Sequence, residues 1–153
     1  MTRRPRTPIA TVLTTSLSIV LVAGCGGDAN KSADELVRET VVSWYSAVAR
    51  GDGAKACALM TEAGRRRDLA GGGIVVEPGG QVRAAPASCE AQVKAASRQL
   101  ARAGLAAQVS AAMVRGVRVL DARATVTIEF AQRHQTLMLR RVAGRWLVDG
   151  APS

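Results

Sequence analysis

The stretch from Arg123 to Gln132 alternates between apolar and polar side chains, and this pattern restricts the fold more than any other feature of the chain. Successive side chains on a β-strand point to opposite faces of the sheet. Ala124, Val126 and Ile128 would therefore lie on one face, with the intervening arginine, threonine and glutamate side chains on the other. The pattern predicts a strand with one buried and one exposed face, and such a sheet needs helices over its buried face.

The residues on either side of this strand extend the predicted sheet. Gln108 to Leu120 is predicted as a strand with a possible bulge at Gly116, followed by a tight turn at Asp121-Ala122. A turn is predicted at Arg133-His134-Gln135. Two further strands then close an antiparallel meander, Gln135 to Val142 and Arg145 to Asp149, with a turn at Ala143-Gly144 between them.

Helical segments come before the sheet, and the first two carry clear N-cap residues. Ser32-Ala33-Asp34-Glu35 is a capping box, and an apolar stripe continues from it to about Arg50. Asp52 can cap a short second helix over residues 53–60. Thr61 can cap a further turn over residues 62–69, where Arg65-Arg66-Arg67 is interpreted as a solvated face.

A glycine- and proline-rich stretch, residues 71–86, separates these segments from the next helix. Residues 74–76 and 81–83 can pair there as a small hairpin; a lid over a pocket is the functional alternative to an exposed loop. Ser88 is expected to cap a third helix from Cys89 to Ala103. The predicted fold class is α+β, with three N-terminal helices packed on an antiparallel sheet of about four strands.

The first residues have the order of an export signal. Met1 to Arg6 is basic, Ile9 to Val22 is uncharged and too short to cross a bilayer as a helix, and small residues follow. The ending Val22-Ala23-Gly24-Cys25 resembles the lipobox of bacterial lipoproteins. That resemblance implies cleavage after residue 24 and acylation of Cys25 with chains such as palmitate, leaving residues 25–32 as a flexible tether. The expected location is the extracytoplasmic face of the cell membrane, with the lipid anchor as the membrane contact.

Two cysteines, Cys57 and Cys89, remain once Cys25 is assigned to the anchor. An even remainder in an exported chain favours a disulfide between them. Free thiols or a metal site are the alternatives. A metal site is disfavoured because the chain has no CxxC spacing and its one histidine, His134, is far away in the sequence. No metal or other cofactor is predicted.

The formal net charge of +9 does not by itself predict a nucleic-acid partner. Arg3, Arg4 and Arg6 lie before the expected cleavage site, and no basic run is interleaved with aromatic residues. The excess positive charge favours attraction to an anionic membrane surface over binding of nucleic acid. Arg65-Arg66-Arg67, interpreted above as a solvated face, could alternatively contact anionic lipid or cell-wall polymer.

The order of these segments is familiar. The strings VVSWYSAVARGDGAKACALMT, RATVTIEF and LMLRRVAGRWLVDG, with a cysteine opening a helix between them, resemble the nuclear transport factor 2-like superfamily, especially small exported actinobacterial lipoproteins of that type. The resemblance covers residues 34–150 and assigns residues 33–150 to one domain. It implies a cone in which a long first helix and two shorter ones pack on a curved antiparallel sheet, often with a pocket at the mouth.

The superfamily includes both enzymes and binding domains, so the fold does not decide the function. No catalytic residue is assigned, and the favoured function is binding of a small apolar ligand or a cell-envelope partner. The alternative is an isomerase or cyclase that uses Tyr45 with Glu129 or Asp149 as a pocket acid–base pair. The candidate pocket residues are the four aromatic ones: Trp44, Tyr45, Phe130 and Trp146.

Overall fold

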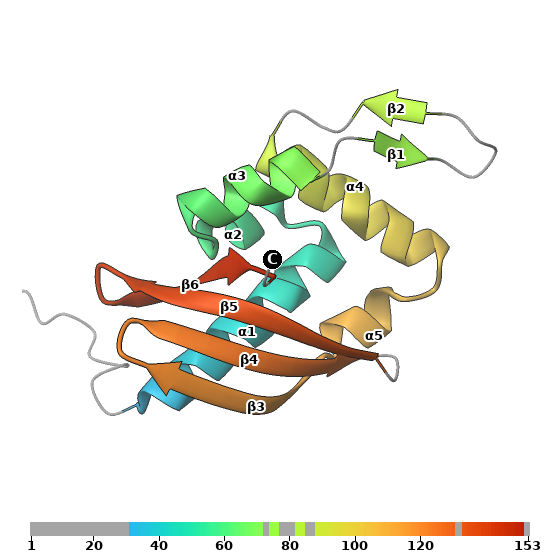
Figure 1. Ribbon diagram of the computed structural model, residues 1–153. Helices are drawn as coiled ribbons and strands as arrows, with labels where there is room; N and C mark the ends of the chain where they lie inside the picture. The colour runs from blue at the N-terminus through green and yellow to red at the C-terminus, as the bar shows by residue number, and fades with distance from the viewer. Residues whose placement is uncertain (1–30, 72–73, 77–81, 85–87, 131–132, 152–153) are drawn as a thin grey trace, which may run out of the picture.

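A computed structural model describes residues 31–151, apart from residues 72–73, 77–81, 85–87 and 131–132 (Figure 1). Within these residues the chain is an α+β protein with five helices and six strands. The helices are α1 (Ala33–Arg50), α2 (Gly53–Ala58), α3 (Glu62–Gly71), α4 (Cys89–Arg102) and α5 (Ala106–Ser110). The strands are β1 (Ile74–Val76), β2 (Val82–Ala84), β3 (Met113–Leu120), β4 (Arg123–Phe130), β5 (Arg133–Val142) and β6 (Arg145–Gly150).

The main sheet is an antiparallel meander in the order β3-β4-β5-β6, as the alternating pattern predicts. The register shifts between Val114 and Gly116, which confirms the bulge predicted in β3. Both predicted hairpin turns are confirmed, and Asp121 and Ala143 adopt positive φ angles of 53° and 48° there. At the other edge, the Val148 amide donates to the Leu59 carbonyl over 2.8 Å, so the segment after α2 covers the edge of β6.

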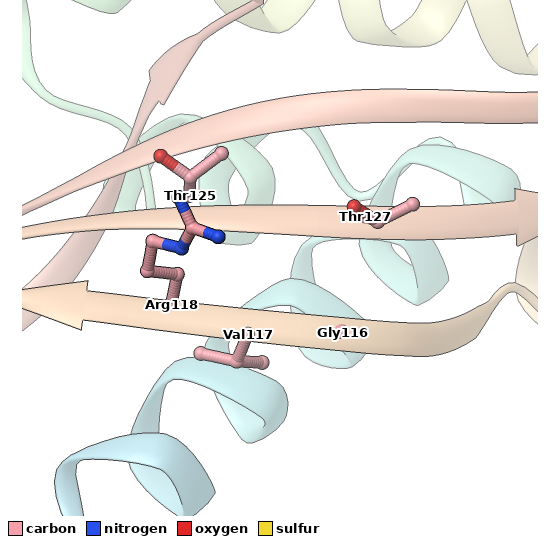
Figure 2. A pocket seen from close by; sticks show the side chains of 5 residues that line it. All are labelled: Gly116, Val117, Arg118, Thr125 and Thr127. Carbon is pink, nitrogen blue, oxygen red and sulfur yellow. The ribbon is translucent and has the colours of Figure 1, made fainter.

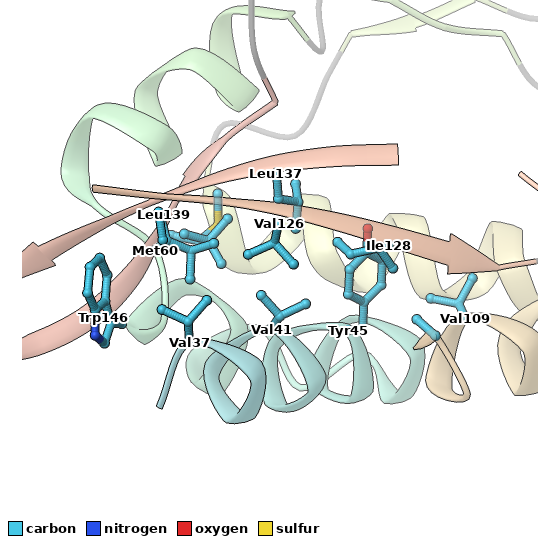
Figure 3. Close-up of a cluster of buried hydrophobic side chains, with 13 residues drawn as sticks. Val37, Val41, Tyr45, Met60, Val109, Val126, Ile128, Leu137, Leu139 and Trp146 are labelled. Carbon is cyan, nitrogen blue, oxygen red and sulfur yellow. The ribbon is translucent and has the colours of Figure 1, made fainter. Parts of the chain in front are cut away.

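Helix α1 forms the main core with the buried face of the sheet. Its capping box is confirmed, because the Glu35 amide donates to the Ser32 hydroxyl and the Ser32 amide donates to the Glu35 carboxylate. Val37 and Val41 pack from α1 against sheet residues such as Val126 (Figure 3). These three side chains are at most 1 % exposed, so the space between α1 and the centre of the sheet is filled.

A second, smaller core lies where α1, α2 and α4 meet. The Cys57–Cys89 disulfide is formed there, with the two Cα atoms 6.1 Å apart, and this confirms the predicted pairing. Asp52 and Ser88 accept backbone hydrogen bonds at the starts of α2 and α4, as predicted. The disulfide therefore fastens α2 to the first residue of α4.

The prediction of three N-terminal helices is corrected by α3, which is a full helix, and by α5, which occupies part of the strand predicted over residues 108–120. Val109 on α5 is only 5 % exposed and lies next to Tyr45 of α1 (Figure 3). Packing on α1 thus stabilises a helical turn at these residues, and pairing of β3 with β4 begins only at Met113, opposite Glu129.

The turn predicted at residues 133–135 is also wrong. These residues belong to β5, where His134 lies opposite Glu129 and Arg133 lies opposite Phe130. The ladder with β4 satisfies their backbone groups, and this partner is not visible in the local sequence. The small hairpin is confirmed, because β1 and β2 pair with Val75 opposite Arg83.

The predicted export signal and Cys25 lie in residues 1–30, outside the described residues. Of the helices that the structure does describe, none combines the length and apolarity needed to span a bilayer. Lipidation of Cys25 therefore stays a prediction.

Candidate functional site

Tyr45 and Trp146, two of the four candidate pocket residues, belong to the core. They are 5 % and 4 % exposed, and Figure 3 shows them well apart in the apolar cluster, with Trp146 beside Val37 and Tyr45 beyond Val41. The Tyr45 hydroxyl donates to the Gln135 side-chain oxygen over 3.1 Å. Burial raises the pKa of Tyr45 to about 12, so the phenol stays protonated at neutral pH.

Trp44 and Phe130 do not complete a pocket with these residues. Trp44 packs edge-on against Tyr45 with the ring centroids 5.0 Å apart, and it contacts both cores. Phe130 ends β4, but the position of its side chain lies outside what the structure describes. The structure therefore does not bring Trp44, Tyr45 and Trp146 together around one open cavity.

Glu129 lies on the exposed face of the sheet, as its place in the alternation predicts. Its carboxylate accepts a hydrogen bond from Arg115 Nε at 2.5 Å, and this bond lowers the pKa of Glu129. His134, which faces it across the strands, is exposed. Among the residues that the structure describes, no group of three or more histidine, cysteine, aspartate or glutamate side chains can hold a metal ion.

Asp149 is buried at the centre of a polar cluster that the sequence analysis missed. The Thr61 hydroxyl donates to one carboxylate oxygen of Asp149, while Arg67 and Arg140 approach the other at 3.2 Å and 3.3 Å. Burial raises the pKa of Asp149, but the hydrogen bond from Thr61 and the charges of Arg140 and Arg67 outweigh it and hold the pKa below its ordinary value. The cluster joins α3 to β5 and β6. Thr61 and Asp149 are 88 residues apart in the chain, so no local sequence pattern predicts that they meet.

The interpretation of Arg65-Arg66-Arg67 as a solvated face holds for Arg66 and Arg67, which are exposed, whereas Arg65 is half-buried. Arg65 donates to the Cys57 carbonyl over 2.8 Å at the end of α2, and Arg67 donates to the Asp149 carbonyl. Arg66 forms an exposed pair with Glu62. The guanidinium groups of Arg65 and Arg67 therefore already bind groups of the protein itself.

A hollow among the described residues lies on the face of the sheet opposite α1 (Figure 2). It encloses about 280 Å³ and is lined by residues of β3 and β4. Gly116, which has no side chain, lies opposite Thr127 just after the bulge, and Arg118 extends toward Thr125 on the next strand (Figure 2). Arg118 has no ion-pair partner among the described residues. The lining residues are Gly116, Val117, Arg118, Thr125 and Thr127.

The lining of this hollow offers hydrogen-bonding groups. Its polar groups are two hydroxyls and a guanidinium, which can donate hydrogen bonds to an acceptor, and its volume lies just below the range typical of drug-sized ligands. One side chain or acidic group of a partner would fill it. Gly116 was the sequence signal for this hollow, because a glycine inside a predicted strand often marks a bulge or a site where a ligand approaches closely.

Comparison of the chain with protein-family models, with curated proteins and with solved structures finds no significant match.

Proposed function

We propose that this protein is an exported lipoprotein, anchored through Cys25 at the extracytoplasmic face of the cell membrane, whose domain is a non-catalytic module that binds a cell-envelope partner. One observation carries the binding role. The helix-covered face of the sheet is filled by its core, whereas the opposite face is solvent-exposed and carries the hollow beside Gly116. We therefore assign partner binding to the exposed face of the sheet.

Export is supported by the Cys57–Cys89 disulfide. Disulfides form and persist in oxidising compartments and are rare in reduced ones. The anchor is supported by the basic start, short apolar run and lipobox-like residues that end at Cys25. Two acyl chains on a processed N-terminus would make membrane attachment stable, where one would be marginal.

The nuclear transport factor 2-like assignment and its cone are part of this proposal. A long first helix lying across an antiparallel four-stranded sheet supports them. The packed core favours a macromolecular partner over a small apolar ligand, because Tyr45 and Trp146 are only 5 % and 4 % exposed and lie in the main apolar cluster. The isomerase alternative requires a pocket carboxylate with a raised pKa near Tyr45. Glu129 and Asp149 both have lowered pKa values, so the alternative gains no support from them.

The anchor is tested by metabolic labelling with an alkyne analogue of palmitate. The wild-type chain is expected to incorporate the label and fractionate with membranes, and a Cys25→Ala variant is expected to do neither. A Cys57→Ala variant is the matched control, since it removes a cysteine of the disulfide and leaves the lipobox intact. Equal labelling of wild type and Cys25→Ala would refute the anchor.

The binding face is tested by placing a photo-crosslinking residue at Thr127 in living cells. We expect a discrete adduct of higher mass from Thr127 and none from Ala101, which is exposed on α4. A Cβ at Gly116 meets no atom within 4 Å, so Gly116→Phe fills the hollow without a clash near the backbone and should abolish the adduct. The same adduct from both positions, or its persistence in Gly116→Phe, would refute the proposed face.

A further inference from the structure

The two main hairpins of the sheet turn at the same end of the molecule. The Arg141 amide donates to the Ala122 carbonyl over 2.8 Å, which joins the turn between β3 and β4 to the end of β5. The turn between β5 and β6 follows directly at Ala143-Gly144. Figure 1 shows α1 beginning at this same end of the sheet. Figure 3 agrees, because Val37 in the first turns of α1 lies beside Trp146, just after the second turn.

This hairpin end combines exposed apolar side chains with arginines. Leu120 is 71 % exposed and Val142 is 44 % exposed, although both are large hydrophobic residues. Three exposed arginines surround them, and none of the three has an ion-pair partner among the described residues. One acidic residue, Asp121, lies in the first turn. We use "hairpin end" for Leu120, Asp121, Arg123, Arg141, Val142 and Arg145.

Exposed apolar side chains beside arginines suit the boundary between headgroups and acyl chains of an anionic bilayer. Apolar side chains gain by entering the headgroup–acyl boundary, and arginines gain from lipid phosphates. Guanidinium groups also bind phosphate in a bidentate manner, which suits them to headgroups. Three arginines against one aspartate give the hairpin end a net positive charge, which an anionic surface attracts.

The chain itself brings this end close to the membrane if Cys25 is lipidated. The described fold begins at Lys31, six residues after Cys25. Six residues span at most roughly 20 Å when fully extended. The start of α1 then stays within that distance of the bilayer surface, and the hairpin end lies on the same side of the molecule (Figure 1).

We propose that the hairpin end docks on an anionic phospholipid surface, with Leu120 and Val142 in the headgroup–acyl boundary and Arg123, Arg141 and Arg145 on lipid phosphates. The inference rests on the proposed anchoring, and it adds an orientation. With its hairpin end on the bilayer, the sheet stands away from the membrane. The face with the Gly116 hollow then points sideways, where an envelope partner can reach it.

The test uses the full chain, reconstituted in vesicles, with a tryptophan placed at the hairpin end. Leu120→Trp adds a fluorophore at an exposed position, and brominated lipid quenches tryptophan only at close range. Met113→Trp is the matched control, because Met113 is 50 % exposed at the other end of the same strand. Wild-type quenching, from Trp44 and Trp146, is subtracted from both.

In phosphatidylglycerol vesicles we expect Leu120→Trp to be quenched at least twofold more than Met113→Trp. Adding Arg123→Gln and Arg145→Gln should reduce this quenching to the Met113→Trp level, and so should phosphatidylcholine vesicles. Unchanged thermal unfolding shows that each variant is folded. Equal quenching at the two positions, or equal quenching in both lipids, would overturn the docking.

Palmitate labelling of the same samples separates this proposal from the anchor. Labelled chain without preferential quenching at Leu120→Trp overturns the docking and leaves the anchor intact. Unlabelled chain that still shows preferential quenching overturns the anchor and supports the docking.

Discussion

Replacing Asp149 with alanine should destabilise the protein although no apolar core residue is lost. The Asp149 side chain is 8 % exposed and accepts a hydrogen bond from the Thr61 hydroxyl, itself in a residue only 7 % exposed. Without the carboxylate, that buried hydroxyl loses its acceptor. Thr61 also accepts the Gly64 amide at the start of α3, over 2.9 Å, so the fixed position of α3 on β6 depends on this cluster.

The expected loss is about 2–4 kcal/mol of unfolding free energy. A charge-assisted hydrogen bond contributes about 1.5–3 kcal/mol, and an unsatisfied buried donor costs about 1–3 kcal/mol, two partly overlapping effects. The arginines add little, because the Arg67 and Arg140 side chains are 46 % and 52 % exposed and each pair contributes about 1 kcal/mol or less. Arg67 also keeps its bond to the Asp149 carbonyl.

Urea unfolding at pH 7 measures this loss, with Glu129→Ala as the control for a carboxylate paired at the surface. Glu129→Ala is expected to change the free energy of unfolding by about 1 kcal/mol or less. A double-mutant cycle with Thr61→Val should give a coupling of about 1 kcal/mol or more. If Asp149→Ala unfolds within about 0.5 kcal/mol of wild type, the cluster does not fasten α3 to the sheet and the reasoning is wrong.

The same cluster predicts a pH dependence. Because the folded pKa of Asp149 is lowered from its ordinary 3.8, its stabilising contribution is complete above that value and is lost as the pH falls through the folded pKa. The difference in stability between wild type and Asp149→Ala should therefore be constant from pH 5 upward and shrink below about pH 3.8. A difference that stays constant below that pH would contradict the ionised form as the stabilising one.

Two further predictions concern the contact between α2 and α4. Replacing Cys57 and Cys89 together with alanine should lower the free energy of unfolding by about 3–4 kcal/mol in the chain-entropy account. Chemical denaturation measures the loss, and a wild-type curve that reduction leaves unchanged would contradict it. Gly53→Ala should cost about 1–3 kcal/mol, because its Cβ would lie 2.8 Å from Glu90 backbone atoms. Gly116→Ala meets nothing within 4 Å, so equal falls in Tm for the two variants would argue against the close helix contact.

Local patterns in the sequence determined most of the secondary structure. The alternation after Arg123 predicted β4, and capping residues such as Ser32 and Ser88 predicted where helices begin. Each of these signals depends on residues within a few positions of one another, so the local sequence alone determines it. The pairing of Cys57 with Cys89 followed from the cysteine count and the expected compartment.

Tertiary structure alone decided what the polar and aromatic side chains do. Tyr45 became a core residue, and Asp149 became the buried acceptor of Thr61, through contacts between residues 88 and 90 positions apart in the chain. Residues 106–110 became helical because α1 offered Val109 a place to pack, and His134 joined β5 because β4 offered it a partner. Such outcomes depend on which distant segment lies alongside, whereas period and capping report only on neighbours. The sequence therefore determined the elements, and long-range packing decided which of its residues remain available for binding.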